Sequence, residues 1–77
     1  MKLIDVGFGN YINALRVISV ASTESLPVRR LMQDAKNAGR VIDVTCGKKT
    51  KAVLITDSDH VICSSLEPSE IVSLMKD

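Results

Sequence analysis

The chain has 77 residues with a formal net charge of +1, and hydrophobic residues make up 45% of it. This length predicts a single domain over residues 1–77, and domains this small often gain stability from self-association. The near-neutral total argues against a monomer that binds a polyanion through its overall charge. No apolar run reaches the ~20 residues of a membrane helix, and the N-terminus does not resemble a secretory signal.

The two cysteines bear on where the protein works. Cys46 and Cys63 are too few for a disulfide framework, and both lie in or beside apolar stretches. Free thiols of this kind are typical of proteins in the reducing cytosol. We therefore expect a cytoplasmic protein with two reduced cysteines and no membrane contact.

The N-terminal part of the chain predicts two strands separated by a bend. Leu3–Val6 is a short apolar run, and Gly7, Gly9 and Asn10 after it tolerate positive φ angles. A lone Gly-x-Gly is weak evidence for a phosphate loop, so we interpret it as a backbone bend whose Asn10 could anchor a loop or reach a phosphate. Leu15–Val20 is rich in β-branched residues and predicts the second strand.

A helix is expected after this second strand. Ser25 can cap its start, Pro27 suits its first turn, and Gly39 is typical of its end. Apolar residues recur between them at spacings of three and four, as on one face of an amphipathic helix.

The second half of the chain predicts three strands and a final helix. Three runs of apolar and β-branched residues predict the strands, at Val41–Val44, Lys51–Thr56 and His60–Ser64. The short Asp57–Asp59 segment makes the last two a hairpin, and Glu67 with Pro68 opens the final helix. The order is therefore ββαβββα, an α+β fold with a twisted, mainly antiparallel sheet and two helices.

Basic residues gather in the middle of the chain. Residues 29–51 hold seven basic and two acidic side chains, a net charge of +5, whereas residues 52–77 have a net charge of −4. Lys48, Lys49 and Lys51 share one turn, in which Gly47 and Thr50 shape the backbone. Lysines at a hairpin tip are often only solvated, but such a cluster also suits the neutralisation of phosphates.

Three arginines extend this candidate site. Arg16 lies at the start of the second strand, and its planar, always charged guanidinium suits a directional contact with a base edge or a phosphate. Arg29 and Arg30 lie early in the first helix and are second-rank candidates. They either contact a nucleic acid or pair with acidic residues of a neighbouring subunit.

No residue pattern predicts catalysis or a cofactor. Asp57, Asp59 and His60 could bind a divalent cation, but Asp-Ser-Asp is also typical of a tight turn, and no second ligand cluster accompanies it. His60 and Cys63 are three apart on a strand, so their side chains point to opposite faces. We therefore expect no catalytic residue, no metal, no cofactor and no small-molecule substrate.

Five segments carry a resemblance to a known family. They are Leu3–Asn10, Arg16–Val20, Pro27–Ala35, Asp43–Lys51 and Ala52–Ser64. A basic turn followed by an apolar strand and then by Asp-Ser-Asp-His-Val-Ile is a specific combination. Over roughly positions 3 to 74, the chain resembles the bacterial regulators of extracellular matrix genes of the RemA type.

The resemblance implies a transcriptional regulator of biofilm-matrix genes that binds double-stranded DNA as a ring-like homo-oligomer. The DNA-contacting arginines of the family fall on Arg16, Lys48 and Lys49, and a further basic position falls on Lys51. The turn has lysines where the family has arginines, so it keeps the charge but loses the planar fork. We therefore expect it to bind the phosphate backbone more than to read a sequence, with avidity supplied by many subunits.

The sequence leaves two other interpretations open. One is a structural or scaffold homo-oligomer, because segregated charge also serves assembly of subunits without any nucleic acid. The other is an RNA-binding protein, since phosphate contacts do not distinguish RNA from DNA. An enzyme is the interpretation with the least support, because the sequence lacks a nucleophile, a base and an orienting group at compatible spacing.

Overall fold

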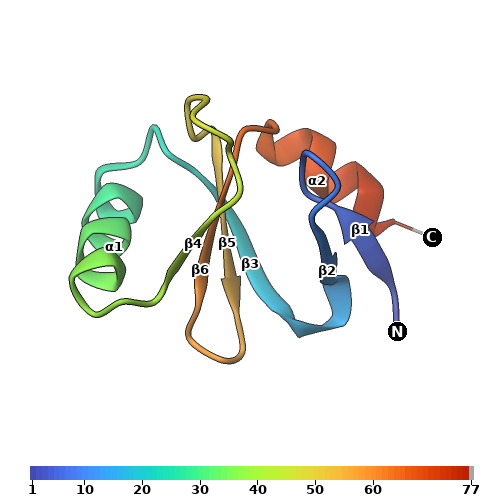
Figure 1. Ribbon diagram of the computed structural model, residues 1–77, viewed down its shortest axis with the longest axis horizontal. Coiled ribbons are helices and arrows are strands. Elements are labelled where there is room, and N and C mark those ends of the chain that lie inside the picture. The colour runs from blue at the N-terminus through green and yellow to red at the C-terminus, as the bar shows by residue number, and fades with distance from the viewer. Residues whose placement is uncertain (77) are drawn as a thin grey trace.

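The computed structural model describes residues 1–76 and arranges them in three layers (Figure 1). The bounds of its elements are β1 Leu3–Asp5, β2 Tyr11–Asn13, the 3₁₀ turn η1 Ala14–Arg16, β3 Val17–Ser22, α1 Leu26–Asn37, β4 Val41–Asp43, β5 Ala52–Thr56, β6 Val61–Ser64 and α2 Pro68–Met75. The predicted α+β class and the order ββαβββα are confirmed. The short strand β2 and the turn η1 come in addition to that order.

The middle layer is a four-stranded sheet in the order β3-β5-β6-β4. The central strand β5 pairs antiparallel with β3 and β6, while β4 pairs with β6 in parallel. The sheet is therefore mixed and mostly antiparallel. One end of β5 places Ala52 opposite both Ser22 and Ser64, and the other end places Thr56 opposite Val17. These are called the Ala52 end and the Thr56 end below.

The sheet is buried from both sides. On one face, Leu54 and Ile62 of the sheet pack in one core cluster with Ile4 of β1 and Ile71 of α2. The opposite face carries a smaller cluster of Ala35, Val53 and Val61 under α1. Because side chains alternate along a strand, successive residues of β5 supply the two clusters in turn. Among the described residues, none of the helices combines the length and apolarity needed to cross a membrane.

The N-terminal hairpin differs in detail from the prediction. Tyr11–Asn13 forms β2, which pairs with β1, and a stretch of three residues is too short to show a strand pattern in the sequence. The Asn13 side chain accepts a hydrogen bond from the Leu15 backbone nitrogen and so caps η1. For this reason Arg16 lies in η1, and the strand begins at Val17 rather than at Leu15.

The tip of this hairpin is a tight turn with left-handed backbone. Gly7, Phe8 and Gly9 have φ angles of 122°, 56° and 77°. The Asn10 side-chain nitrogen donates to the Gly7 carbonyl at 2.8 Å, and the Gly7 nitrogen donates to Asp5 Oδ1 at 2.8 Å. The side chain of Asn10 is therefore used to hold its own turn, which leaves the tip in one shape.

The chain between β4 and β5 begins with a second tight turn. Cys46 and Gly47 have φ angles of 53° and 83°, and the Lys48 nitrogen donates to the Thr45 carbonyl at 3.1 Å. Two positive φ angles in succession are the pattern of a type I′ turn. Its base is held by Thr45, which is buried and donates to Asp43 Oδ1 from both its nitrogen (2.9 Å) and its hydroxyl (2.7 Å).

The conformation of this turn predicts opposite effects for two substitutions of Cys46. Cys46→Asn should raise the free energy of unfolding by about 0.5–1 kcal/mol, because asparagine tolerates the left-handed region. Cys46→Val should lower it by a similar amount, about 0.5–1 kcal/mol, because a β-branched side chain clashes there. Urea unfolding of the three proteins measures both changes. A shift in the same direction for both variants would contradict the assigned turn.

The Asp43–Thr45 contact predicts a stability change in acid. The hydrogen bonds from the Thr45 hydroxyl and nitrogen lower the pKa of Asp43. The ionised carboxylate therefore stabilises the fold fully above the unfolded pKa of about 3.9, and this contribution is lost as pH falls through the folded pKa. The urea midpoint of wild type should exceed that of Asp43→Asn at neutral pH, and the difference should shrink towards about pH 3.

The exposed Asp34 on α1 offers a matched control, since Asp34→Asn also removes one negative charge. A difference between wild type and Asp43→Asn that stays constant over the whole pH range would show that the carboxylate charge of Asp43 does not support the turn.

Candidate nucleic-acid interface

Lys48 ends the second tight turn, and Lys49 and Lys51 follow it; residues 47–51 are called the lysine turn below. All three lysines lie exposed at the Ala52 end of the sheet. The Lys51 nitrogen donates to the Ser64 carbonyl at 2.9 Å, so the backbone of the turn is tied to β6 where Lys51 enters β5. The Lys51 ammonium lies 3.6 Å from Glu67 Oε1, and the side chains of both residues are about half exposed. Such a surface pair contributes roughly 0–1 kcal/mol, so Lys51 can exchange this partner for another anion.

The lysines share a pocket of about 450 Å³ with the tip of the β1–β2 hairpin. Its lining residues are Gly7, Phe8, Lys48, Lys49, Lys51, Ser65 and Leu66. Within residues 1–76 this lining contains three lysines and no carboxylate. The Lys48 ammonium lies 5.4 Å from the centroid of the Phe8 ring, within the range of a cation–π contact. The pocket therefore suits an anion, and one of its walls is aromatic.

Arg29 is brought close to the lysine turn through Thr23. The Arg29 Nε donates to the Thr23 carbonyl at 2.8 Å, and the Thr23 hydroxyl donates to the Thr50 carbonyl at 3.1 Å. Thr50, which the sequence predicts to shape the turn, is tied to Thr23 by this bond to its backbone carbonyl. Arg30 is exposed on the same helix. The Ala52 end of the molecule thus carries the lysine turn together with the start of α1.

Arg16 lies at the Thr56 end instead. Its Nε donates to both carboxylate oxygens of Asp57, at 2.9 and 2.8 Å, although the Arg16 side chain is 63% exposed. This hydrogen bond and the charge of Asp57 raise the pKa of Arg16, which is cationic at any physiological pH. The five residues of β5 separate Arg16 from the lysine turn. At the rise of a β-strand, this length corresponds to about 15 Å.

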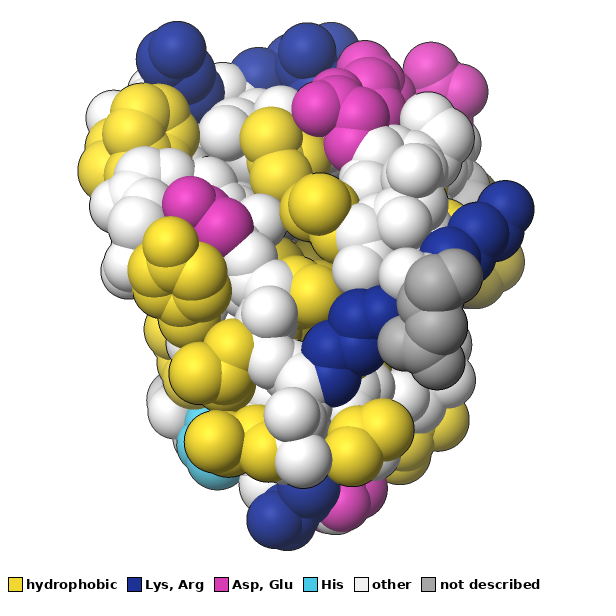
Figure 2. All heavy atoms as spheres, turned by 90° about the vertical axis from the view of Figure 1, so that its right-hand side faces the viewer, with side chains coloured by type: hydrophobic (Ala, Val, Ile, Leu, Met, Phe, Trp, Pro, Cys, Tyr) yellow, Lys and Arg dark blue, Asp and Glu magenta, His cyan; other side chains and the backbone are white. Residues whose placement is uncertain are grey.

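A second arginine lies at the Thr56 end. Arg40 Nη1 donates to the Asp59 carbonyl at 2.7 Å, in the turn that Arg16 also contacts. Figure 2 shows basic side chains at both the upper and the lower end of the face that it presents, with acidic side chains beside them. The sequence predicted one basic site, whereas the structure places Arg16 and Arg40 at the end of the sheet opposite the lysines, beside Asp57 and Asp59.

The Asp57–Asp59 segment forms the turn that the sequence predicts. Asp59 has a φ angle of 64°, and the Ser58 hydroxyl lies 2.8 Å from His60 Nδ1. In residues 1–76 no group of three or more His, Cys, Asp and Glu side chains is placed to hold a metal ion. Cys63 is buried, and its burial, followed by the charge of Asp43, raises the pKa of its thiol.

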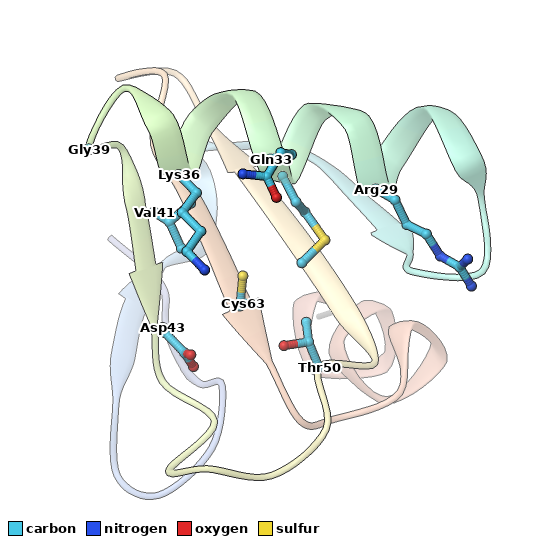
Figure 3. Close-up of a pocket in the computed structure, with 9 residues that line it drawn as sticks. Arg29, Gln33, Lys36, Gly39, Val41, Asp43, Thr50 and Cys63 are labelled. Carbon is cyan, nitrogen blue, oxygen red and sulfur yellow. The ribbon is translucent and has the colours of Figure 1, made fainter.

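A second hollow of about 530 Å³ lies between α1 and the sheet (Figure 3). The Lys36 side chain extends from α1 toward the sheet, and the Cys63 sulfur points toward α1. Asp43 lies on β4 at the edge of the hollow, and the Arg29 guanidinium points out at its far end. Its charged lining is of both signs, which fits a phosphate chain less well than the lysine pocket does.

The contact between Phe8 and Lys48 is the feature that sequence analysis missed. The two residues are forty positions apart, and periodicity carries no information about such a contact. The available signal was an aromatic residue between Gly7 and Gly9, in a chain that has one Phe and one Tyr. A bulky apolar residue at the centre of a glycine bend is a poor choice for a solvated turn, and that mismatch points to a role for the side chain.

Comparison with known proteins finds relatives that match most of this chain. It is 49% identical over 73 residues to a protein of Thermoanaerobacter sp. (strain X514), covering 95% of this chain and 76% of the relative. Identity is 47% over 73 residues with a protein of Geobacillus thermodenitrificans (strain NG80-2), covering 95% of this chain and 84% of the relative. Identity is 52% over 71 residues with a protein of Bacillus pumilus (strain SAFR-032), covering 92% of this chain and 80% of the relative. Each relative carries the name "Putative regulatory protein".

A family model matches the same span of the chain. The match covers residues 3–74 and therefore includes both helices up to Leu74, every described strand, the lysine turn and the hairpin tip that faces it. The model is described as extracellular matrix regulatory protein A-like. Together, the match over nearly the full length and the identities of about one half show that this chain belongs to the RemA-like family.

Proposed function

We propose that this protein is a DNA-binding transcriptional regulator of extracellular-matrix, or biofilm, genes. The names of the relatives and the description of the family support a regulatory role. The observation that carries the proposal of DNA as the ligand is the pocket that Lys48, Lys49 and Lys51 line, whose lining within residues 1–76 contains no carboxylate. Glu67 lies 3.6 Å from the Lys51 ammonium, outside this lining. Three exposed ammonium groups held by one turn suit a phosphate backbone better than a small neutral substrate.

The chemistry of the contact follows from the side chains. Each ammonium that reaches a phosphate releases condensed counterions from the DNA, which favours binding at low salt. Lysine has no planar fork, so these contacts neutralise charge with little preference for a base. Arg29 lies close enough to the lysine turn, through Thr23, to add a contact on the same side.

Arg16 enters the proposal in a different way. It lies at the Thr56 end, so within one subunit a single duplex must span the length of β5 to reach both Arg16 and the lysines. In a closed ring, the Thr56 end of one subunit can instead stand near the Ala52 end of the next. Arg16 exchanges Asp57 for a phosphate in either arrangement, at little cost because the pair is exposed.

A homo-oligomer is part of the proposal. One subunit has a net charge of only +1, so strong binding needs many lysine turns on one particle, each acting at the high effective concentration that the others create. Large hydrophobic side chains also lie exposed, among them Tyr11, Leu15 and Ile18, at 62%, 73% and 68%. Surfaces of this kind are typical of contacts between subunits.

Salt dependence tests the phosphate contact. Wild-type affinity for duplex DNA should fall steeply with salt, and Lys49→Ala should reduce the slope of log K against log salt by about 0.9 for each subunit that contacts the DNA. Arg16→Ala should reduce the slope in the same way if Arg16 reaches a phosphate. Mobility shifts with random and A·T-rich duplexes at several salt concentrations measure these slopes.

Lys76→Ala is the matched control, because it removes the same charge from an exposed lysine just after α2. It should leave the slope unchanged. Wild-type binding that does not change between low and high salt would contradict phosphate contacts, and more effective competition by RNA than by duplex DNA would assign the site to RNA. If the double variant Lys48→Ala/Lys49→Ala no longer assembles, and wild type gives no mobility shift with DNA, the result would favour a scaffold.

The solution mass tests the oligomer. A multiple of the 8.4 kDa subunit is expected at micromolar concentration, because the exposed hydrophobic side chains and the opposite charges of the two chain segments favour association. Light scattering coupled to size exclusion measures it. A monomer under these conditions would contradict binding through avidity.

A further inference from the structure

Phe8 occupies a position that the stability of the fold does not explain. The side chain is 52% exposed, so it is not part of either core cluster. Its φ angle of 56° lies in the left-handed region, which is unfavourable for a bulky side chain. The turn is held by Asp5 and Asn10 through hydrogen bonds that do not involve the Phe8 side chain. An exposed aromatic ring in strained backbone points to a function.

The ring lies against the lysine pocket. The Lys48 ammonium stands 5.4 Å from the ring centroid, and Phe8 with Leu66 forms an apolar wall beside Lys49, Lys51 and Ser65. A lysine side chain normally loses considerable rotamer freedom when it binds a ligand. Contact with the ring restricts Lys48 before any ligand arrives, so less entropy is lost on binding.

The shape and chemistry of this pocket fit one unit of a nucleic-acid backbone. Cationic groups suit the phosphate, an aromatic face suits the apolar ring of a sugar, and the Ser65 hydroxyl can donate to an oxygen. The volume of about 450 Å³ lies in the usual range of about 300–1,000 Å³ for small-ligand sites. A bare phosphate would use the lysines and leave the aromatic wall without a role.

We propose that this pocket receives one nucleotide of the bound DNA, with its phosphate on the lysines and its deoxyribose against Phe8. Phe8 is then a DNA contact in its own right, and it also positions Lys48. The inference rests on the proposed function, because it names the part of DNA that the lysine pocket takes. It predicts a component of affinity that does not depend on salt, since Phe8 carries no charge.

The first test compares Phe8→Leu with Phe8→Tyr in the salt titration. Phe8→Leu should weaken duplex binding by about threefold to fivefold at every salt concentration, while the slope stays at the wild-type value. Phe8→Tyr keeps an aromatic face and should bind as wild type does. Wild-type affinity in Phe8→Leu, together with weakened binding in Lys49→Ala, would overturn the inference and leave the proposed function intact.

Thermal unfolding of these variants separates a structural role from a contact. Leucine and tyrosine experience the same left-handed backbone as phenylalanine, so both variants should unfold close to the wild-type temperature. If Phe8→Leu unfolds at a much lower temperature than wild type, loss of folded protein would explain its weaker binding. Phe8 would then have a structural role and not a contact with DNA.

The second test uses fluorescence, because the chain contains no Trp. In Phe8→Trp the single indole should be protected from acrylamide quenching when duplex DNA is added. Leu74→Trp is the control, since Leu74 is 44% exposed on α2 and does not line the lysine pocket. Its quenching should not change on addition of DNA.

Three other results of this test have definite meanings. Unchanged quenching of Phe8→Trp in a complex that mobility shift detects would overturn the inference alone. Protection of Phe8→Trp by deoxyadenosine monophosphate at micromolar concentration, without DNA, would assign the pocket to a free nucleotide and overturn the backbone assignment. Absence of any DNA complex in wild type would remove the proposed function and this inference with it.

Discussion

The burial of β5 on both of its faces is the constraint on which the rest of the structure depends. Ala52, Val53 and Leu54 are fully buried, and their strand has hydrogen-bonded neighbours on both sides. Burial of these side chains stabilises the sheet by about 25 cal/mol for each Å² of apolar surface removed from water. A one-residue shift of β5 would move each of its side chains to the opposite cluster and disrupt the packing of both, so both of its ends are held in place. Every candidate contact residue lies near one of those ends or on a segment attached to one.

The rigid sheet allows its loops to adopt conformations that would be unfavourable in isolation. Phe8, Cys46 and Asp59 each have a positive φ angle, and each lies at a turn beyond a strand end. The turn at Phe8 lines the lysine pocket, and the turn at Cys46 leads into Lys48, so the shapes of both decide where Lys48 stands relative to the aromatic ring. Burial in the sheet therefore stabilises the strained turns, and these turns position the basic side chains.

The charge distribution reconciles the proposed binding of DNA with a net charge of only +1. Acidic residues lie beside basic ones, as Asp57 does beside Arg16 and Glu67 beside Lys51. These exposed pairs are weak, so a phosphate can replace the carboxylate at small cost. They also reduce the attraction of a single subunit for any polyanion, so the proposed DNA binding requires several subunits that present their lysine turns together. Under this proposal, assembly sets the affinity and the local turn sets the kind of contact.

The sequence by itself determined the class of fold, the order of its elements and the identity of the basic turn. Apolar periodicity in the first helix, the β-branched runs of the strands and the Gly47 turn are local signals, and local physics is enough to interpret them. Strand β2 gives no such signal because three residues show no period. The start of β3 at Val17 gives none either, because the 3₁₀ turn that Asn13 caps takes up Ala14–Arg16 before it.

The tertiary structure alone decided which of these residues meet. It placed Arg16 with Asp57 at the far end of β5, although the sequence analysis had grouped Arg16 with the lysines. It also brought Phe8 to Lys48 across forty positions. The physical reason is that such contacts depend on strand register and on the packing of segments that are distant in sequence. The type of each residue sets what chemistry it can perform, but only the packed sheet sets its partner.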